Sequence, residues 1–367
     1  MNIGIPKERR PFEFRVGLSP AGVEILKLHG HTIFVEHEAG VGAGFHDQEY
    51  ERVGARIVYS PEEVFGRADL LLKFARPLQN ELEWMRPGNI LAGLLHLASA
   101  RQEKIDILLE NNITAIAYEQ IEEADGTTPV KKPLAQIGGR MTAQIAAHFM
   151  QNYKGGKGIL LSGIPGVPPA EVVILGAGVA GTAATQAFLG LGAHVTVLDS
   201  DLLPLQRLEE RFPAAVTMIA TPKNITRTCA FADVVVGAVL VPGERAPVVV
   251  EREIVKSMKP RSLIIDMSID QGGCVETSRP TTHDQCTFIE EGIIHYCVPN
   301  IPAAVARTAT HAFVNAAMPY ILELADKGLH KAVDENPALE KAVSAMDGRM
   351  LHLARLTGEA GGGYGLD

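Results

Sequence analysis

The stretch that decides the fold runs from Glu171 to Asp199 and reads EVVILGAGVAGTAATQAFLGLGAHVTVLD. It begins with an apolar run typical of a buried strand, turns at glycines, continues as an alanine-rich helix and ends in a second apolar strand. Strand, helix and strand at this spacing predict two parallel strands joined by a right-handed crossover. We therefore expect this segment to belong to an α/β domain.

The glycines inside that stretch have the spacing G-x-G-x-x-G, at Gly176, Gly178 and Gly181. The motif alone is a weak signal, but here it closes a strand and opens a helix, which is the context that dinucleotide binding requires. The alternative is a cluster of glycines that only serves packing. We predict that this loop binds a dinucleotide through Gly176, Ala177, Gly178, Val179, Ala180 and Gly181.

Asp199 ends the second strand of the same stretch. An acid at this position accepts hydrogen bonds from both ribose hydroxyls and repels a 2′-phosphate. The predicted cofactor is therefore NAD rather than NADP.

Composition and charge narrow the remaining possibilities. The chain has 367 residues, which predicts two or three domains, and 46% hydrophobic and 21% charged residues, as in globular proteins. Its formal net charge of −9 gives no reason to expect nucleic acid or an anionic membrane as a partner. The expected partner is a small molecule, held by locally placed cations.

Targeting and metal signals are missing from the sequence. The N-terminal MNIGIPKERR lacks the apolar region of a signal peptide, and no apolar run reaches the ~18 residues of a membrane span. The four cysteines show no C-x-x-C spacing and no zinc-ligand pattern. We expect reduced thiols, a cytoplasmic location and no metal.

Apolar runs alternate with helical patterns along the rest of the chain. Ser19-Pro20 and Ser60-Pro61 predict helix starts, because serine caps a helix and proline fits its first turn. Long helices are predicted over 134–150 and 302–326, and the tail 358–367 is expected to be disordered. The predicted strands cover 2–5, 32–35, 70–74, 90–95, 171–175, 194–198, 234–236, 263–266 and 293–298.

Some polar residues are candidates for chemistry, each with a plain alternative. His96 ends an apolar strand, where α/β sheets place ligands, but a lone histidine there is usually a core residue. Asp270 follows a strand of the nucleotide domain, where it either faces the cofactor or caps the turn at Gly272-Gly273. Arg15 taken alone is more often a solvated arginine, and Asn300 between prolines is equally a turn former.

Several longer motifs resemble the alanine dehydrogenase family, which includes the soluble NAD-binding part of proton-pumping transhydrogenase. They cover about residues 1 to 345, and the most specific are GIPGVPP at 163–169 and IDQGG at 269–273. The others are GIPKE at 4–8, FRVGLSPAGV at 14–23, DLLLK at 69–73, AIAYE at 115–119 and GAVLVPG at 237–243.

The resemblance implies two Rossmann-like, doubly wound domains with a cleft between them. Residues 1–128 plus 306–367 would form a discontinuous substrate domain, and residues 129–305 the NAD-binding domain. It also implies a homo-oligomer, since bacterial members of the family are usually hexamers.

The resemblance further implies a role for individual residues. Arg15 matches the arginine that holds the substrate carboxylate, His96 the general acid/base, and Asp270 a second acid/base near the cofactor. Val239, Leu240 and Ile269 match cofactor-side positions, and Asn300 lies beside the substrate. The implied reaction is the reversible, NAD-dependent oxidative deamination of an L-amino acid to a 2-oxo acid and ammonia.

The chain departs from the family on the substrate side. Where the family reads K-V-K-E-P-L, this chain has Lys73-Phe74-Ala75-Arg76, so the second lysine is lost. Lys73 matches the first lysine and would share a strand face with Ala75. Ala92 and Leu94 stand where the family has larger residues, and 134–138 also differs. These changes predict a wider, less polar pocket for a substrate bulkier than alanine.

Other functions remain open on the sequence alone. Ordinary alanine dehydrogenation is compatible with the sequence if Lys73 or Arg76 is repositioned. An imine reductase that forms secondary or cyclic amino acids would not need ammonium, which distinguishes it. A non-catalytic NAD-binding protein is the third possibility, and retention of His96 and Asp270 argues against it.

Overall fold

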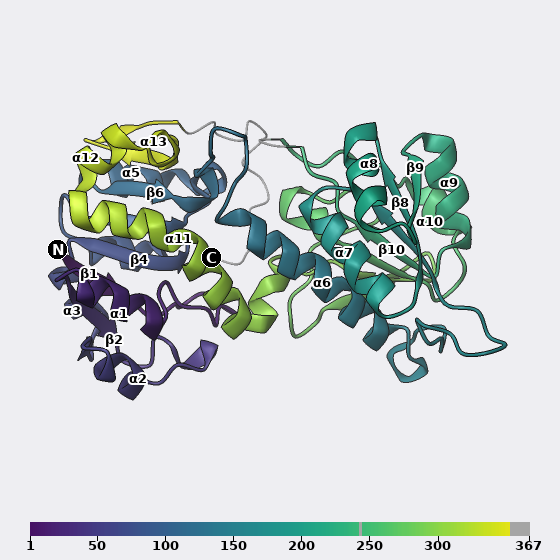
Figure 1. The fold of residues 1–367 in the computed structure, drawn as a ribbon, viewed down its shortest axis with the longest axis horizontal. Coiled ribbons are helices and arrows are strands. Elements are labelled where there is room, and N and C mark those ends of the chain that lie inside the picture. Colours follow the sequence, from purple (N-terminus) through teal and green to yellow (C-terminus); the bar gives the residue numbers. More distant parts are fainter. Residues whose placement is uncertain (242–243, 353–367) are drawn as a thin grey trace. The chain divides into compact units, whose positions relative to one another are not determined.

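The computed structural model describes residues 1–241 and 244–352, and the chain divides into two compact units, each with its own sheet (Figure 1). The first unit is formed by 1–134 and 303–367, and the second by 135–302. Both sheets are mostly parallel and flanked by helices, which confirms the predicted α/β class. The tail 358–367, for which disorder was predicted, lies outside the described residues.

The sheet of the first unit has eight strands in the order β15-β14-β6-β5-β4-β1-β2-β3. Its strands are β1 (Asn2–Ile5), β2 (Thr32–Glu36), β3 (Arg56–Val58), β4 (Leu70–Ala75), β5 (Ile90–Leu94), β6 (Thr114–Ala117), β14 (Val343–Met346) and β15 (Arg349–Met350). β1 to β6 are parallel, whereas β14 pairs antiparallel with β6 and with β15. The antiparallel edge was not predicted, because it depends on a pairing between distant parts of the chain.

Two helices of this unit begin at the predicted Ser-Pro pairs. Ser19 Oγ accepts a hydrogen bond from Gly22 N at 3.4 Å, and Ser60 Oγ accepts one from Glu63 N at 3.2 Å. These bonds satisfy amides that the first helical turn leaves unpaired. The helices of the unit are α1 (Pro20–Leu28), α2 (Asp47–Arg52), α3 (Pro61–Arg67), α4 (Gln79–Glu83), α5 (Gln102–Glu110), α11 (Ala306–Lys327), α12 (Leu329–Glu335) and α13 (Pro337–Ala342).

Hydrophobic cores lie on both faces of the first sheet. Leu70, Leu72 and Phe74 of β4 belong to one core cluster, while Leu71 belongs to another. This alternation is what a strand buried on both sides requires. Because both faces of the sheet are buried, we expect polar side chains that could bind a ligand at the ends of the parallel strands.

The sheet of the second unit has seven strands in the order β12-β13-β11-β10-β7-β8-β9. Its strands are β7 (Glu171–Leu175), β8 (His194–Asp199), β9 (Val216–Ile219), β10 (Val234–Gly237), β11 (Leu263–Asp266), β12 (Thr287–Glu290) and β13 (Ile293–Tyr296). Only β12, at the edge, is antiparallel to its neighbour. The helices are α6 (Lys131–Phe149), α7 (Val179–Gly190), α8 (Leu202–Arg211), α9 (Pro222–Phe231) and α10 (Arg252–Ser257).

The two long helices were predicted with different accuracy. α6 covers nearly all of the expected range, and the boundary between the units falls within it, after Leu134. The second long helix begins later than predicted: Ile301–Val305 form a 3₁₀ helix, η6, and α11 starts at Ala306. Short 3₁₀ turns are common at α-helix N-termini. No helix among residues 1–241 and 244–352 is both long and apolar enough to cross a membrane.

A close approach of α6 to α7 makes Gly139 a sensitive position. A Cβ at Gly139 would lie 2.2 Å from Ala180 O and 3.0 Å from Ala183 Cβ, whereas a Cβ at Gly190 of α7 would meet nothing within 4 Å. Gly139→Ala should therefore lower the free energy of unfolding by about 1–3 kcal/mol, because it overpacks the contact. Gly190→Ala is the matched control and should be neutral or stabilising by up to ~1 kcal/mol. Urea unfolding measures both, and equal values would contradict this packing.

Candidate active site

The predicted dinucleotide loop joins β7 to α7 in the second unit. Gly176 has φ of 106°, and a Cβ there would lie 2.4 Å from Ala238 O, so only glycine fits this turn. A Cβ at Gly181 would lie 1.8 Å from Gly176 O. A Cβ at Gly178, by contrast, would meet nothing within 4 Å, and no side chain caps α7 at this residue.

An open Gly178 at the start of a twelve-residue helix suits a phosphate group. The first amides of α7 carry no side-chain cap, so they can donate to an anion, and the helix dipole favours negative charge there. The loop therefore fits the pyrophosphate of a dinucleotide. Ala177 is buried, whereas Val179 is exposed at the helix start.

Asp199 lies beside this loop at the end of β8. Its Oδ2 accepts a hydrogen bond from Ala177 N at 2.6 Å, and its Oδ1 accepts one from Asp201 N at 2.9 Å. Each carboxylate oxygen can accept a further bond, so the half-buried group still has capacity for ribose hydroxyls. The acid thus fixes the glycine loop as well as standing where a ribose is expected.

The segment after β11 carries Asp270 in the 3₁₀ helix η5 (Met267–Gln271). Asp270 is exposed, and its Oδ1 accepts a hydrogen bond from Asn300 N at 3.2 Å. Ser268 Oγ donates to Val239 O at 2.8 Å, and Ile269 is buried. These contacts bring Val239, Ile269, Asp270 and Asn300 together, while Leu240 nearby in the chain is exposed.

Asp266, which the sequence reasoning did not single out, holds this segment in place. The fully buried carboxylate accepts hydrogen bonds from Ser268 N and Cys274 N at 3.0 Å and from Val275 N at 3.3 Å. Burial raises its pKa, although these hydrogen bonds oppose the shift. Asp266, rather than Asp270, therefore caps the turn, and the Asp270 carboxylate is left exposed.

His96 lies just beyond β5 in the first unit and has an unusual backbone. Its φ of 45° and ψ of 43° are left-handed, and its side chain is 58% exposed. A non-glycine residue in this conformation costs of order 1 kcal/mol and is more frequent at functional sites. His96 is thus exposed at a strand end and is not a core residue.

Glu119 imposes that conformation. It belongs to the 3₁₀ helix η3 (Tyr118–Gln120) that follows the neighbouring strand β6. Its carboxylate accepts hydrogen bonds from Leu95 N at 3.0 Å and His96 N at 2.5 Å, and Oε1 lies 3.9 Å from His96 Nδ1. The sequence reasoning assigned Glu119 no role. The available signal was its position directly after a strand that is parallel to β5.

Arg15 is buried rather than solvated. Its Nε and Nη2 donate to Glu13 Oε1 and Oε2 at 2.6 and 2.5 Å, and its guanidinium lies 3.9 Å from the centre of the Phe74 ring. The side chains of Arg15 and Glu13 are only 3% and 4% exposed. Glu13 was also missed, because nothing local in the sequence pairs it with Arg15.

Lys73 is completely buried between two carboxylates. Its Nζ lies 3.0 Å from Glu8 Oε2 and 3.0 Å from Glu81 Oε1, so it is an ion-paired core residue and not an exposed cation. The pairing of β4 with β5 shifts register between Leu72 and Ala75. This irregularity interrupts the simple alternation that placed Lys73 and Ala75 on one face.

The other substrate-side departures lie around the same strand ends. Ala75 is half-buried and pairs with Leu94 across β4 and β5. Leu94 and Ala92 belong to the same core cluster as Phe74, and Ala92 is fully buried. Position 75 is therefore the more accessible of these changed positions.

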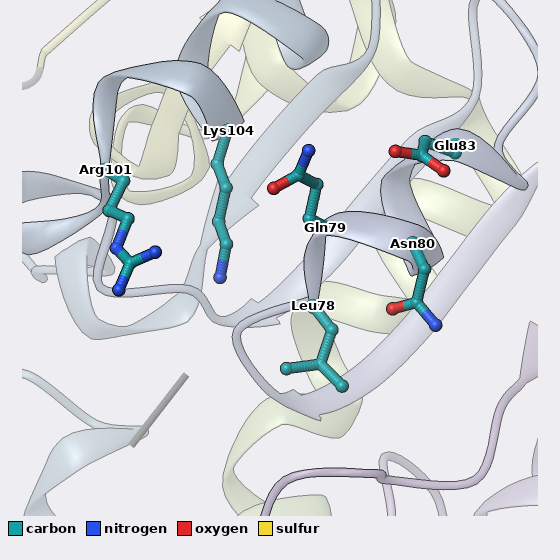
Figure 2. A pocket seen from close by; sticks show the side chains of 6 residues that line it. All are labelled: Leu78, Gln79, Asn80, Glu83, Arg101 and Lys104. Carbon is teal, nitrogen blue, oxygen red and sulfur yellow. The ribbon is translucent and has the colours of Figure 1, made fainter. Parts of the chain in front are cut away.

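A separate pocket of about 410 Å³ lies between α4 and α5 (Figure 2). Its lining residues are Leu78, Gln79, Asn80, Glu83, Arg101 and Lys104. None of the residues predicted for the site lines this pocket, and we assign it no role in the chemistry. Within residues 1–241 and 244–352, no group of three or more His, Cys, Asp or Glu residues is arranged to hold a metal ion.

Most of the cysteine thiols are buried. All four are free, and Cys229, Cys274 and Cys297 are buried. Burial raises the pKa of Cys229 and of Cys297 to about 12, so these thiols stay protonated near neutral pH.

Comparison with known proteins identifies the family. The family model "Alanine dehydrogenase/PNT, N-terminal domain" matches residues 4–138, and the corresponding C-terminal domain model matches residues 142–353. The chain is 46% identical over 356 residues to an alanine dehydrogenase of Methanococcus maripaludis, covering 96% of this chain and 95% of that protein. It is 43% identical over 352 residues to one of Mycobacterium tuberculosis, with 96% and 95% covered.

A solved structure agrees with the sequence matches. An L-alanine dehydrogenase superposes with a TM-score of 0.93 at 44% identity, covering 96% of this chain and 97% of that chain. The chain therefore belongs to the alanine dehydrogenase/PNT family and is an NAD-dependent amino acid dehydrogenase.

Proposed function

We propose that the chain catalyses the reversible oxidative deamination of an L-amino acid whose side chain is larger than that of alanine. The amino acid, NAD⁺ and water give a 2-oxo acid, ammonium, NADH and a proton. The observation that carries the assignment of the site is the exposed His96, held in a left-handed conformation by Glu119 at the end of a parallel strand. The family membership supports the same reaction class.

NAD, when bound, would accept the hydride that leaves the substrate Cα. The glycine loop would hold the pyrophosphate of NAD, and Asp199 would hold its ribose. Val239, Leu240 and Ile269 would lie beside the bound cofactor. Hydrogen bonds from the amides of α7 and to the Asp199 carboxylate would orient the cofactor. These roles rest on the open Gly178 and on the capacity of the Asp199 oxygens.

The substrate roles fall to Arg15 before α1, Lys73 of β4 and Asn300 after β13. Arg15 would bind the substrate carboxylate through donors that Glu13 leaves available, and Glu13 with Phe74 would fix the orientation of its guanidinium. Lys73 would act as the charge partner of Glu8 and Glu81, and Asn300 would lie beside the substrate.

Proton transfer falls to His96 and Asp270. After hydride transfer the substrate is an imine, and water adds to its carbon. Neutral His96 would accept a proton as the resulting carbinolamine collapses to the 2-oxo acid and ammonia. Asp270, which is exposed and bonded to Asn300 N, would act as the second acid/base.

The size of the substrate follows from position 75. The family lysine is absent there, and Ala75 is half-buried at the end of β4, so its short side chain leaves room. Leu94 and Ala92 contribute less, since they pack in the core. We also propose a homohexamer and a cytoplasmic location; the four free thiols support a reducing compartment.

His96→Asn should reduce kcat by about 10²–10⁴-fold, because it removes the acid/base group. Asparagine tolerates the left-handed backbone, so the loop should keep its conformation. NADH formation gives the rate, and quenching of protein fluorescence gives the affinity for NADH, which should stay within about twofold. His330→Gln, at an exposed histidine of α12, is the control. Full activity of His96→Asn would remove His96 from this role.

Asp199→Asn should raise the ratio of NADP to NAD activity about 10–100-fold, because the repulsion of a 2′-phosphate is lost while an acceptor for Ala177 N remains. The measurement is kcat/KM for both cofactors with one amino acid. Asp201→Asn is the matched control, since asparagine also caps α8 and the ratio should not change. An unchanged ratio in Asp199→Asn would contradict the ribose role.

NADH formation across the L-amino acids should be fastest with a substrate larger than alanine. The reverse assay consumes NADH with the matching 2-oxo acid plus ammonium, and turnover without ammonium would instead favour an imine reductase. Ala75→Met and Ala75→Lys both fill the space at position 75. Each should shift kcat/KM toward alanine, relative to the larger substrate, by about tenfold or more. Alanine as the best substrate of the wild type would contradict the proposed pocket.

A further inference from the structure

The first unit contains a buried charge cluster at the ends of β1 and β4. Its carboxylates outnumber its cations by one, and six of the seven side chains are at most 7% exposed, with Arg9 at 22%. The members of this buried charge cluster are Glu8, Arg9, Glu13, Arg15, Glu36, Lys73 and Glu81.

Most carboxylates of the cluster have strong partners of their own. Glu13 receives two hydrogen bonds from the Arg15 guanidinium. Glu36 pairs with Arg9 and accepts from Lys7 N at 2.9 Å. Glu81 lies against two cations, Lys73 and Arg9, and its Oε2 accepts from Leu78 N at 2.7 Å.

Glu8 is the carboxylate with the weakest compensation. It has one cation, Lys73, which it shares with Glu81, and its Oε1 accepts from Phe74 N at 2.7 Å and Ala75 N at 3.3 Å. Burial raises the pKa of Glu8 to about 7, with Lys73 opposing the shift and Glu81 and Glu13 adding to it. The excess negative charge of the cluster therefore falls on Glu8.

Position 75 explains why the cluster lacks a cation. Where the family pattern K-V-K-E-P-L has a second lysine, this chain has Ala75, whose amide lies 3.3 Å from Glu8 Oε1. A lysine at 75 would carry an ammonium group within side-chain reach of Glu8. With that lysine, the numbers of carboxylates and cations in the cluster would be equal.

We propose that Glu8 takes up one proton when the substrate carboxylate binds to Arg15. The proton is needed because Ala75 stands where a lysine would otherwise supply a cation to the cluster. The inference rests on the role of Arg15 given under the proposed function. An anion placed on Arg15 adds a second uncompensated charge to a buried region where charges interact strongly. Protonation of the Glu8 carboxyl by a proton from solvent removes one of these charges. Glu8 is thus a specificity-determining residue, since it sets how readily the site accepts an anionic ligand.

The direction of the pH dependence follows from this coupling. Below about pH 7, Glu8 already carries its proton in the free protein, so binding takes up none. Above that pH, Glu8 is ionised before binding, so each further pH unit should weaken binding of a 2-oxo acid about tenfold. The charged groups that act on Glu8 are Lys73 of β4, Glu81 of α4 and Glu13 before α1. Arg15 pairs with Glu13, and Arg9 pairs with Glu81.

The test measures binding of pyruvate to the enzyme–NADH complex without ammonium, so that no reductive amination follows. The dissociation constant is determined from pH 6 to pH 9 for the wild type and Glu8→Gln. Between pH 7 and pH 9 the wild-type constant, relative to that of Glu8→Gln, should rise about 50-fold. Contributions from His96 are common to both proteins and cancel in this ratio.

Two variants at position 75 keep the test decisive if Glu8→Gln folds poorly. Ala75→Lys restores the missing cation and should abolish the proton uptake, whereas Ala75→Met adds similar bulk without charge and should retain it. Titration calorimetry at pH 8 in two buffers of different ionisation enthalpy counts the protons directly. We expect about one proton per pyruvate for the wild type and Ala75→Met, and about none for Ala75→Lys.

Equal proton uptake in Ala75→Lys and Ala75→Met, or none in the wild type, would overturn the inference. Deamination of L-amino acids with NAD, assayed on the same preparations, decides the proposed function separately. Turnover without linked proton uptake rejects the role of Glu8 alone. If the complex binds neither pyruvate nor any other 2-oxo acid of the panel, both the Arg15 role and this inference fail.

Discussion

Carboxylates that accept backbone amides at the ends of parallel strands are the interaction on which the site depends. Where a parallel strand ends, its next amides have no ladder partner, and a buried amide without one is costly. Acid side chains take that place in the last residues of β4 and just after β5, β7 and β11. These acids are Glu8, Glu119, Asp199 and Asp266. Each of these acids binds a chain segment that also contains a residue proposed to bind substrate or cofactor or to transfer a proton.

A buried carboxylate loses its hydration, and the two units stabilise these buried charges in different ways. Asp266 accepts hydrogen bonds from three backbone amides, and these bonds stabilise its buried charge. In the first unit the acids share a few cations, and two cations of the substrate side, Arg15 and Lys73, are already committed to internal partners. An anionic substrate bound at Arg15, as proposed, would enter a region in which each cation already pairs with a carboxylate, and a cation added at position 75 would change that charge balance.

Local signals in the sequence predicted much of the fold. Ser19-Pro20 begins a helix, and the glycine loop after β7 has the expected form, because both depend on residues within one turn. The antiparallel strand β14 and the register shift in β4 were missed, since they arise from pairings between distant segments.

The same distinction separates the site residues that were found from those that were not. His96 and Asp270 stand two and four residues after apolar strands, which is visible in the sequence. Glu119 accepts from amides beyond the neighbouring strand β5, so its function appears only once the strand order is known. Asp266 accepts from amides of the segment that follows it, and that function appears only once the turn of this segment is known. The Glu119 carboxylate binds the backbone amides of Leu95 and His96, so the conformation at His96 does not rest on the side chains proposed to line the substrate, and these can be exchanged without moving the histidine. With His96 in the proposed role, such a scaffold would allow substrate preference to diverge through single substitutions during evolution while the proposed acid/base keeps its place.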